Sequence, residues 1–454
     1  MSTQTNLRQS DITHHLHPYT NAVKHEQVGP RIIDRGEGIY VFDDQGNKYI
    51  EGMAGLWSVA VGFNEQRLVD AATRQMAKLP FYHTFSHKSH TPSVQLAEKL
   101  VQLTEGKMRA AFFTNSGSEA NDTVIKMVWY YNNALGRGEK KKIIARNRGY
   151  HGVTVASASL TGLAPNHRGF DLPLPQMKHV SCPHFYREGR EGESEADFAT
   201  RMADELEALI LKEGPDTVAA FIGEPVMGAG GVIIPPETYW DKVQKVCRKY
   251  DVLVVADEVI TGFGRLGTMF GSQKFGIEPD IMVLSKQITS SYQPLAAVLL
   301  SEPLHAVITR YSGELGVFGH GYTASGHPVA TAVALENIRI IEERGLVENA
   351  QRAGEVLQAS LRALAGHPLV GEVRGTGLIA AVELVADKHS KRPFDPLGKA
   401  GAAIFERSHV HGLIVRGIQD SIAFCPPLII TEDEVRDMVN RFKRTLEEVK
   451  GQLA

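Results

Sequence analysis

The sequence predicts an α/β protein in which a large domain, built on a mainly parallel central sheet, is accompanied by a smaller α+β domain. Between about residues 110 and 300, short apolar runs such as "VLVVADEV" alternate with helical patterns, which indicates parallel βαβ units. From about residue 325, long amphipathic patterns surround short strands such as "GLIAAVELV". The chain of 454 residues also exceeds the size at which one hydrophobic core usually stops growing.

A β-hairpin is the first element that the sequence predicts, at residues 39–50. Its sequence, "IYVFDDQGNKYI", places runs of aromatic and β-branched residues on both sides of turn-forming residues. Within the alternating region, Val124, Met127 and Val128 recur at helical spacing and predict an amphipathic helix.

The composition argues against nucleic-acid and membrane partners. The formal net charge is −3, and lysine and arginine are scattered, with Lys140–Lys142 as the densest run. The first residues lack the apolar core of a signal peptide, and no stretch approaches the roughly 18 apolar residues of a membrane span. Cys182, Cys247 and Cys425 lie too far apart for a disulfide framework or a paired-cysteine zinc site. We therefore expect a soluble, cytoplasmic protein.

Lys286 stands out as an isolated charge. In "DIMVLSKQITSSYQPLAAVLLSE" it is the only charged side chain between Asp280 and Glu302, and it follows an apolar run. One interpretation is a lysine at the rim of a strand, with its ammonium in water. The other is a lysine whose pKa is lowered by desolvation, so that its amine can attack a carbonyl and form a Schiff base.

Asp257 and Glu258 end another apolar run, at the sheet edge where open α/β folds bind ligands. Gly262, Gly264 and Gly267 follow in a formal G-x-G-x-x-G pattern, which raises the alternative of an NAD-dependent dehydrogenase. That fingerprint needs its last glycine to open a helix, and the sequence that follows leaves no room for a regular crossover helix. We therefore interpret these glycines as loop-forming.

Ser116, Gly117 and Ser118 lie between an apolar strand and a helix in "FFTNSGSEANDTVIKMV". Small residues at such a turn leave backbone N–H groups accessible and without hydrogen-bond acceptors, beside the positive end of the helix dipole. The turn is therefore a candidate phosphate site. An ordinary capped helix start is the alternative interpretation.

Three further short stretches have more than one interpretation. Tyr150 and His151 lie at a tight turn, where aromatic rings usually pack. His15 and His17, in "HLHPYT", are expected to cap or pack, because no cysteines or carboxylates cluster with them, and we predict no metal site. Arg416 ends an apolar run and forms either a structural ion pair or a clamp for a carboxylate.

Taken together, the motifs resemble one family. Their order is similar to that of the class III aminotransferases, which use pyridoxal phosphate on a fold type I scaffold. The resemblance covers nearly the whole chain and rests on "TNSGSEAND", "GYHG", "GEPVMGAGG", "VVADEVITGFGRLG", "LSKQITSSYQP" and "GYTASGHP".

The resemblance assigns the central roles. Lys286 would hold pyridoxal phosphate as a Schiff base and move the proton between substrate and cofactor carbons. Asp257 would pair with the pyridinium nitrogen and keep it protonated. Tyr150 would stack on one face of the ring, and Val259 would pack on the other.

The resemblance also implies further cofactor contacts and a partner. Thr323 would bind the phosphate of the other subunit, which implies an obligate homodimer with shared active sites and possibly a tetramer. The remaining cofactor-binding residues would surround the phosphate and the polar side of the ring: Ser116, Gly117, Ser118, His151 and Glu224.

The domain boundaries follow from the same resemblance. Residues 1–50 would form an N-terminal segment that joins the small domain, residues 51–324 the large cofactor-binding domain, and residues 325–454 the C-terminal small domain. Many members carry glycine or alanine directly after the lysine and glycine before the following tyrosine. Gln287 and Ser291 replace these residues here, so we expect a different loop geometry.

"MAGLWSVAVGF", Phe85 and Arg416 look like the ω-transaminases, and most like those acting on 6-aminohexanoate. The expected reaction moves an amino group from a terminal amine donor to pyruvate, giving an aldehyde or ketone and alanine. Candidate donors are 6-aminohexanoate, β-alanine and arylalkyl amines. Apolar walls would come from Tyr19, Trp57, Phe85 and Tyr150, with a mobile Arg416 for carboxylates. Alternatives are putrescine, 4-aminobutyrate or ornithine aminotransferases that use 2-oxoglutarate, and an intramolecular aminomutase.

Overall fold

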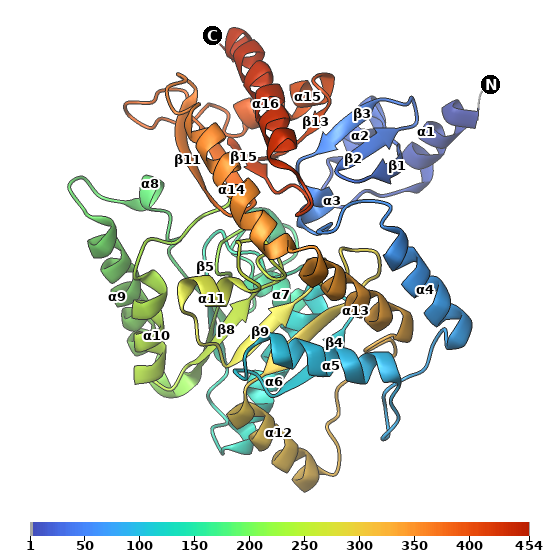
Figure 1. Ribbon diagram of the computed structural model, residues 1–454. Helices are drawn as coiled ribbons and strands as arrows, with labels where there is room; N and C mark the ends of the chain where they lie inside the picture. Colours follow the sequence, from blue (N-terminus) through green and yellow to red (C-terminus); the bar gives the residue numbers. More distant parts are fainter. Residues whose placement is uncertain (1–2, 454) are drawn as a thin grey trace.

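The computed structural model describes residues 3–453. A seven-stranded sheet, in the order β4-β10-β9-β8-β7-β5-β6, forms the centre of the lower part in Figure 1. Strand β10 is antiparallel to both of its neighbours, and the other strands point one way, so the sheet is mainly parallel as predicted. Its strands are β4 (Ala110–Thr114), β5 (Lys142–Arg146), β6 (Met177–Val180), β7 (Val218–Gly223), β8 (Leu253–Asp257), β9 (Ile281–Leu284) and β10 (Ala296–Leu300).

Helices cover both faces of this sheet, which explains why β7, β8 and β9 are buried along their whole length and apolar except for Asp257 at the end of β8. One face packs against the buried residues of α6 (Gly117–Ala134), α7 (Val155–Leu160) and α12 (Glu302–Leu315). The other face packs against α5 (Thr91–Leu103), α9 (Glu195–Glu213) and α10 (Tyr239–Lys249). The predicted helix around Val124 is α6.

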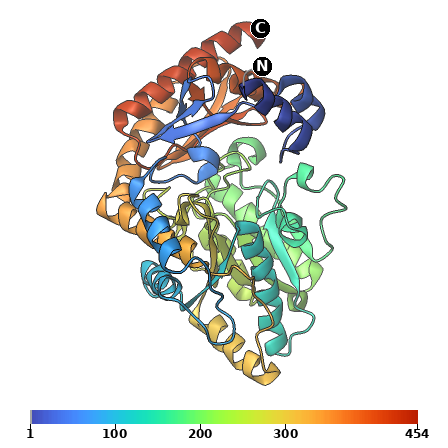
Figure 2. The same ribbon diagram turned by 90° about the vertical axis from the view of Figure 1, so that its right-hand side faces the viewer.

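Two smaller four-stranded sheets lie above the large one in Figures 1 and 2. The first joins β1 (Ile33–Glu37), β2 (Tyr40–Asp43) and β3 (Lys48–Glu51) to β13 (Leu413–Ile414), which pairs in parallel with β3. The second is antiparallel and contains β11 (Val370–Thr376), β12 (Ile379–Leu384), β15 (Ser421–Phe424) and β14 (Arg416–Ile418). Residues from both ends of the chain therefore share one sheet, whereas the domain boundaries stay a prediction.

The remaining helices connect and cover these sheets. Near the N-terminus lie α1 (Thr3–His14), α2 (Ala22–Val28), α3 (Ala54–Trp57) and α4 (Gln66–Lys78). The later helices are α8 (Phe185–Glu188), α11 (Gly271–Phe275), α13 (Pro328–Glu343), α14 (Leu346–Arg362), α15 (Lys399–Val410) and α16 (Glu432–Leu453). Short 3₁₀ helices are η1 (Ala164–Asn166), η2 (Pro215–Thr217) and η3 (Lys286–Ile288).

Two local predictions are confirmed. Residues 39–50 contain the antiparallel pair β2 and β3, with Tyr40 opposite Ile50. Gly262, Gly264 and Gly267 lie in a loop, and the next helix, α11, has only five residues. The backbone of Gly264 and of Gly267 has positive φ, which favours glycine. The glycine pattern therefore does not form a dinucleotide fingerprint.

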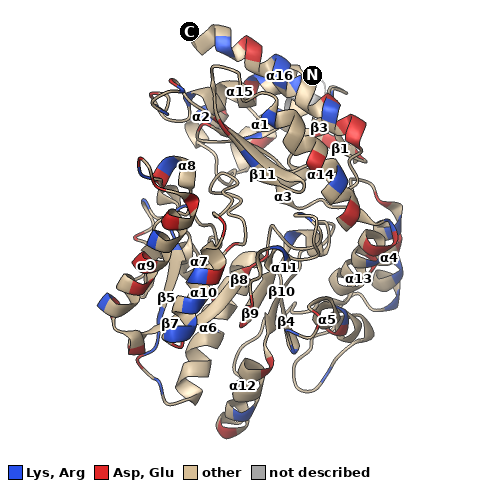
Figure 3. Ribbon diagram, turned by 60° about the vertical axis from the view of Figure 1, so that its left-hand side comes forward, with Lys and Arg blue, Asp and Glu red and all other residues tan. Residues whose placement is uncertain are grey.

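Charged residues lie mainly on the outer helices. Figure 3 shows both signs on α4, α9 and α10, whereas the strands of the central sheet are mostly uncharged. Over residues 3–453, none of the helices is both long enough and apolar enough to cross a membrane.

Candidate active site

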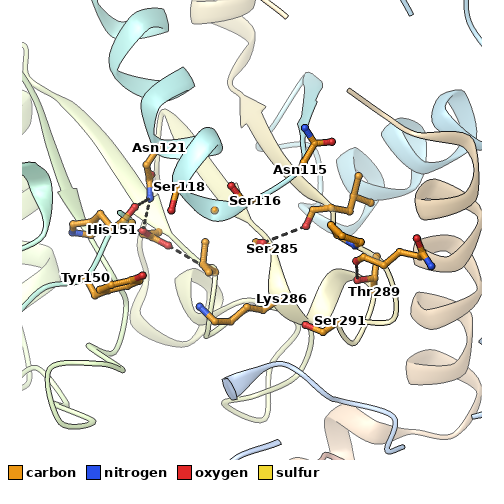
Figure 4. A pocket seen from close by; sticks show the side chains of 17 residues that line it. Asn115, Ser116, Ser118, Asn121, Tyr150, His151, Ser285, Lys286, Thr289 and Ser291 are labelled. Carbon is orange, nitrogen blue, oxygen red and sulfur yellow. Dashed lines mark hydrogen bonds and ion pairs between the residues drawn. The ribbon is translucent and has the colours of Figure 1, made fainter. Parts of the chain in front are cut away.

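A cavity of about 360 Å³ opens at the sheet edge where β4, β8 and β9 end. Because these strands point the same way, residues distant in the sequence meet at one edge. The cavity brings together eight residues that the sequence singles out, as Figure 4 shows for those labelled there. They are Ser116, Gly117, Ser118, Tyr150, His151, Asp257, Val259 and Lys286.

Lys286 follows β9 and begins η3, with a backbone φ of 47°. A left-handed backbone is uncommon for a residue with a side chain and is concentrated at functional sites. The Lys286 amine forms no hydrogen bond or ion pair with any residue of the described range 3–453 and extends into the cavity (Figure 4). Burial lowers its pKa, so more of the amine is neutral than in water. The snorkelling interpretation is therefore wrong.

Asp257 ends β8 and is buried. Its Oδ2 accepts a hydrogen bond of 3.0 Å from Asn121 and lies 2.7 Å from Nδ1 of His151. Its Oδ1 accepts from the backbone N–H of Val259 at 3.2 Å. Burial raises the pKa of Asp257, but the hydrogen bonds from His151 and Asn121 outweigh it, so the pKa is lowered overall. The carboxyl group is therefore ionised.

Ser116 caps α6, because its Oγ accepts a hydrogen bond of 3.2 Å from the backbone N–H of Glu119. The capped helix start is therefore confirmed. The backbone of Gly117 and Ser118 begins the helix at the cavity wall, so the helix dipole points its positive end into the cavity. A β-carbon at Gly117 would lie 3.3 Å from Cγ2 of Val259. Glycine thus allows the close approach of α6 to the loop after β8.

Glu224 lies behind the cavity rather than in its wall. Its carboxyl group accepts hydrogen bonds from the backbone N–H groups of Tyr150, at 3.1 Å, and Gly228, at 2.9 Å. Burial raises the pKa of Glu224. Glu224 therefore fixes the backbone position of Tyr150.

A second cavity of about 450 Å³ shares Tyr150 and Lys286 with the first. Its walls are mainly apolar and include Leu56, Ile260 and Phe405, together with the predicted residues Tyr19, Trp57 and Arg416. The Trp57 side chain is buried, and the hydroxyl of Tyr19 accepts a hydrogen bond of 2.6 Å from Asn166.

Arg416 is half-buried at the start of β14 and faces this second cavity. Its guanidinium forms no hydrogen bond or ion pair with any described residue, so the interpretation as a structural ion pair is wrong. Burial lowers its pKa, but a guanidinium stays cationic at neutral pH. A half-buried cation without a partner favours an anionic ligand.

Phe85 and Thr323 lie outside both cavities of their own chain. Both are exposed, and the Phe85 ring lies against the segment of Thr323, since a β-carbon at Gly321 would be 2.9 Å from Cε1 of Phe85. The two residues thus share one surface region.

Asn121, Asn166 and the contacts of Gln287 were not predicted from the sequence. Asn121 follows Gly117 by one helical turn, and this spacing could have predicted that it faces the cavity. Gln287 is buried and donates to the backbone oxygen of Ile260 at 2.6 Å, so it joins η3 to a wall of the second cavity. Ser291 lines the first cavity.

Residues 20–446 match the family described as "Aminotransferase class-III". The chain is 51% identical over 436 residues to gamma aminobutyrate transaminase 1, mitochondrial, of Solanum lycopersicum, covering 96% of this chain and 85% of the relative. It is 49% identical over 440 residues to gamma-aminobutyrate transaminase 1, mitochondrial, of Oryza sativa subsp. japonica, covering 97% and 85%.

Solved structures of high similarity have the same fold. The omega transaminase from Pseudomonas jessenii in complex with PMP superimposes with a TM-score of 0.98 at 63% identity, over 98% of this chain and 99% of that one. A structure described as a transaminase with L-Ala gives a TM-score of 0.92 at 60% identity, over 93% of this chain and 100% of that one. A thermostable omega transaminase variant, with one tryptophan, one phenylalanine and one arginine replaced, was engineered for the synthesis of enantiopure bulky amines. This variant superimposes with a TM-score of 0.98 at 62% identity, over 99% of this chain and 100% of the variant.

Proposed function

Because the chain belongs to the class III aminotransferases, fold type I enzymes that use pyridoxal phosphate, we propose that it transfers the amino group of a terminal amine donor to pyruvate. The donor would be an ω-amino acid, such as 6-aminohexanoate or β-alanine, or an arylalkyl amine. Alanine and an aldehyde or ketone would be the products. The observation that carries this proposal is the unpaired Arg416 in an apolar cavity that also contains Lys286.

The first cavity fits the cofactor. The cavity is bordered by the ionised, buried Asp257, by the N-terminus of α6 and by the Lys286 amine, which extends into it without a partner among the described residues. The backbone N–H groups of Gly117 and Ser118 would hold the phosphate, and Asp257 would hold a proton at the pyridine nitrogen. Tyr150 and Val259 would enclose the ring. When bound, the cofactor supplies an electron sink for the carbon that loses a proton.

Lys286 would perform the proton transfer. Its lowered pKa favours the neutral form of the amine, which would remove the proton from the amine-bearing carbon of the donor and hold it as an ammonium until it is donated to the cofactor carbon. His151 and Asn121 hold Asp257 in place through their hydrogen bonds to Oδ2. Glu224 holds Tyr150 by its backbone, so the wall shared by the two cavities is fixed.

The second cavity supports the choice of donor and acceptor. Its apolar walls suit a methylene chain, and each buried CH₂ contributes roughly 0.8 kcal/mol. Arg416 would bind the carboxylate of pyruvate through two parallel hydrogen bonds. Its side chain would move out of the cavity when the uncharged tail of an amine donor is bound. The relative engineered for the synthesis of enantiopure bulky amines has a tryptophan, a phenylalanine and an arginine replaced, and Trp57, Phe85 and Arg416 are residues of the same three types here.

A second candidate function is the transamination of 4-aminobutyrate with 2-oxoglutarate as acceptor. The names of the plant relatives, which are gamma-aminobutyrate transaminases, favour 4-aminobutyrate as the donor. Their names also place them in mitochondria. For this chain we propose a reducing compartment, for which the cytoplasm is our candidate, because Cys182, Cys247 and Cys425 are free.

A matrix of donors and acceptors tests both candidates. The purified holoenzyme would be given 1-phenylethylamine, β-alanine, 4-aminobutyrate, putrescine, ornithine or 6-aminohexanoate, each with pyruvate or 2-oxoglutarate. We expect alanine formation, with kcat/KM rising from β-alanine to 6-aminohexanoate. Glutamate formation in clear excess over alanine would contradict pyruvate as the acceptor and favour the second candidate.

A further inference from the structure

Three histidines surround one carboxylate at the start of the chain, away from the two cavities described above. Nε2 of His17 and Nε2 of His25 each lie 2.9 Å from Oδ1 of Asp11. Nδ1 of His15 lies 3.2 Å from Oδ2 of the same carboxylate. Asp11 belongs to α1 and His25 to α2, while His15 and His17 lie in the loop between them. These four residues are called the histidine cluster below.

Within the histidine cluster, Asp11, His15 and His17 are close enough together to be ligands of one metal ion, and His25 contacts the same carboxylate oxygen as His17. Zinc binds imidazole nitrogen and carboxylate oxygen at about 2.0–2.2 Å, which places neighbouring ligands of a tetrahedral site about 3.3 Å apart. One ligand atom from each of Asp11, His15 and His17 lies within 4.8 Å of the other two. Imidazole nitrogen together with carboxylate oxygen is a donor set for zinc and the neighbouring divalent transition metals.

The histidine cluster is also accessible to an ion. It borders a surface cavity of about 230 Å³, lined by residues of α1, α2 and the loop between them. The His25 side chain is 12% exposed, whereas the His15 side chain is 61% exposed. The inner side of the cluster is therefore fixed by packing, and the outer side is open to solvent.

We propose that Asp11, His15, His17 and His25 bind a divalent transition-metal ion, for which zinc is the probe. The bound ion would join α1 to α2 across the loop that carries Tyr19. Tyr19 lines the second cavity and accepts the hydrogen bond from Asn166, so an ion in the histidine cluster would hold this part of the cavity wall. The site itself does not depend on the proposed substrate.

Zinc titration of the holoenzyme tests the site, with a chromophoric chelator as competitor. We expect one competing site per chain in the wild type. Asp11→Asn, which keeps the shape of the side chain, and His25→Ala should each weaken zinc binding at least about tenfold, because even the loss of a residue that only supports a metal ligand costs about 10–100-fold in affinity. His389→Ala is the matched control, because His389 is exposed and lies outside the histidine cluster. Its zinc affinity should equal that of the wild type.

Two outcomes would overturn the proposal. Either the wild type fails to compete with the chelator, or Asp11→Asn and His15→Ala bind zinc as tightly as His389→Ala does. The His15 variant serves where His25→Ala does not fold, because a mostly exposed side chain can be removed without a cavity. X-ray absorption of the zinc complex should show nitrogen and oxygen neighbours at about 2.0–2.2 Å.

Discussion

Among single residues, Lys286 is the one that we propose transfers the proton. Lys286→Ala removes the amine that would take the proton, and general acid–base groups contribute about 10²–10⁴-fold to rate. We expect at least that loss in multiple-turnover alanine formation. Lys286→Arg is the matched control, since it keeps a cation that cannot act as a base at neutral pH. Turnover near the wild-type rate in either variant would contradict the role of Lys286.

Asp257 is expected to act by its charge rather than by its shape. Asp257→Asn keeps the size of the side chain but cannot stabilise a proton on the pyridine nitrogen. Removing one such pre-positioned charge should lower kcat about 10²–10³-fold. The far-ultraviolet circular dichroism should stay unchanged. A kcat close to that of the wild type would exclude this role.

Arg416 should matter in only one of the two half-reactions. A hydrogen bond to a charged group contributes about 1.5–3 kcal/mol, so Arg416→Ala should raise KM for pyruvate at least about tenfold. The half-reaction with 1-phenylethylamine, which has no carboxylate, serves as the internal control and should change little. Stopped-flow absorbance of the cofactor measures each half-reaction separately. Equal losses in both would show that Arg416 does not select carboxylates.

At the scale of elements, helix α6 has two separable functions, since its first turn is both capped and part of the cavity wall. Ser116→Ala should lower the free energy of unfolding by about 1 kcal/mol through loss of the cap. It should also weaken the affinity for pyridoxal phosphate. Ser194→Ala is matched to it, because Ser194 caps α9 through a hydrogen bond of 3.1 Å to Asp197, away from the cavity.

Thermal unfolding and cofactor titration distinguish these effects. Both variants should lose similar stability as apoproteins, and only Ser116→Ala should lose cofactor affinity. Equal cofactor affinity in the two variants would mean that the Ser116 side chain and its cap do not contribute to cofactor binding.

Elements that end in functional residues were predictable, whereas contacts between distant elements were not. Asp257 and Lys286 each end an apolar run, and neighbouring parallel strands bring such ends together. Nothing local in the sequence places Tyr19 beside Asn166, or Phe85 against the segment of Thr323, because these pairs are separated by more than a hundred residues. The histidine cluster was predictable only in part. Asp11 and His15 have helical i, i+4 spacing, but His25 belongs to another helix.

For the whole molecule, we propose a homodimer in which Phe85 and Thr323 complete the site of the other subunit. Their shared exposed region and their absence from both cavities of their own chain support this arrangement. Thr323→Ala should raise the Kd for pyridoxal phosphate about tenfold or more, by loss of a hydrogen bond to a charged phosphate. Thr73→Ala, an exposed threonine on α4, is the control and should leave the Kd unchanged.

Co-expression of Lys286→Ala and Thr323→Ala chains provides the sharper measurement. If Thr323 acts in the other subunit, a mixed dimer contains one site with both residues intact and regains wild-type cofactor affinity and turnover at that site. If Thr323 acts in its own chain, no mixed dimer has an intact site. Absence of recovery at limiting cofactor would therefore contradict a shared site.

The parallel pairing of β13 with β3 has a consequence for the order of events during synthesis. All residues that line the first cavity lie between Asn115 and Leu295, whereas the second cavity needs both Pro18 and Arg416. Domains fold as the ribosome releases them, but β3 cannot pair with β13 until residue 414 has emerged. A nascent chain can therefore assemble the cofactor-binding surface first, and it completes the pocket that selects the substrate only when translation is almost finished.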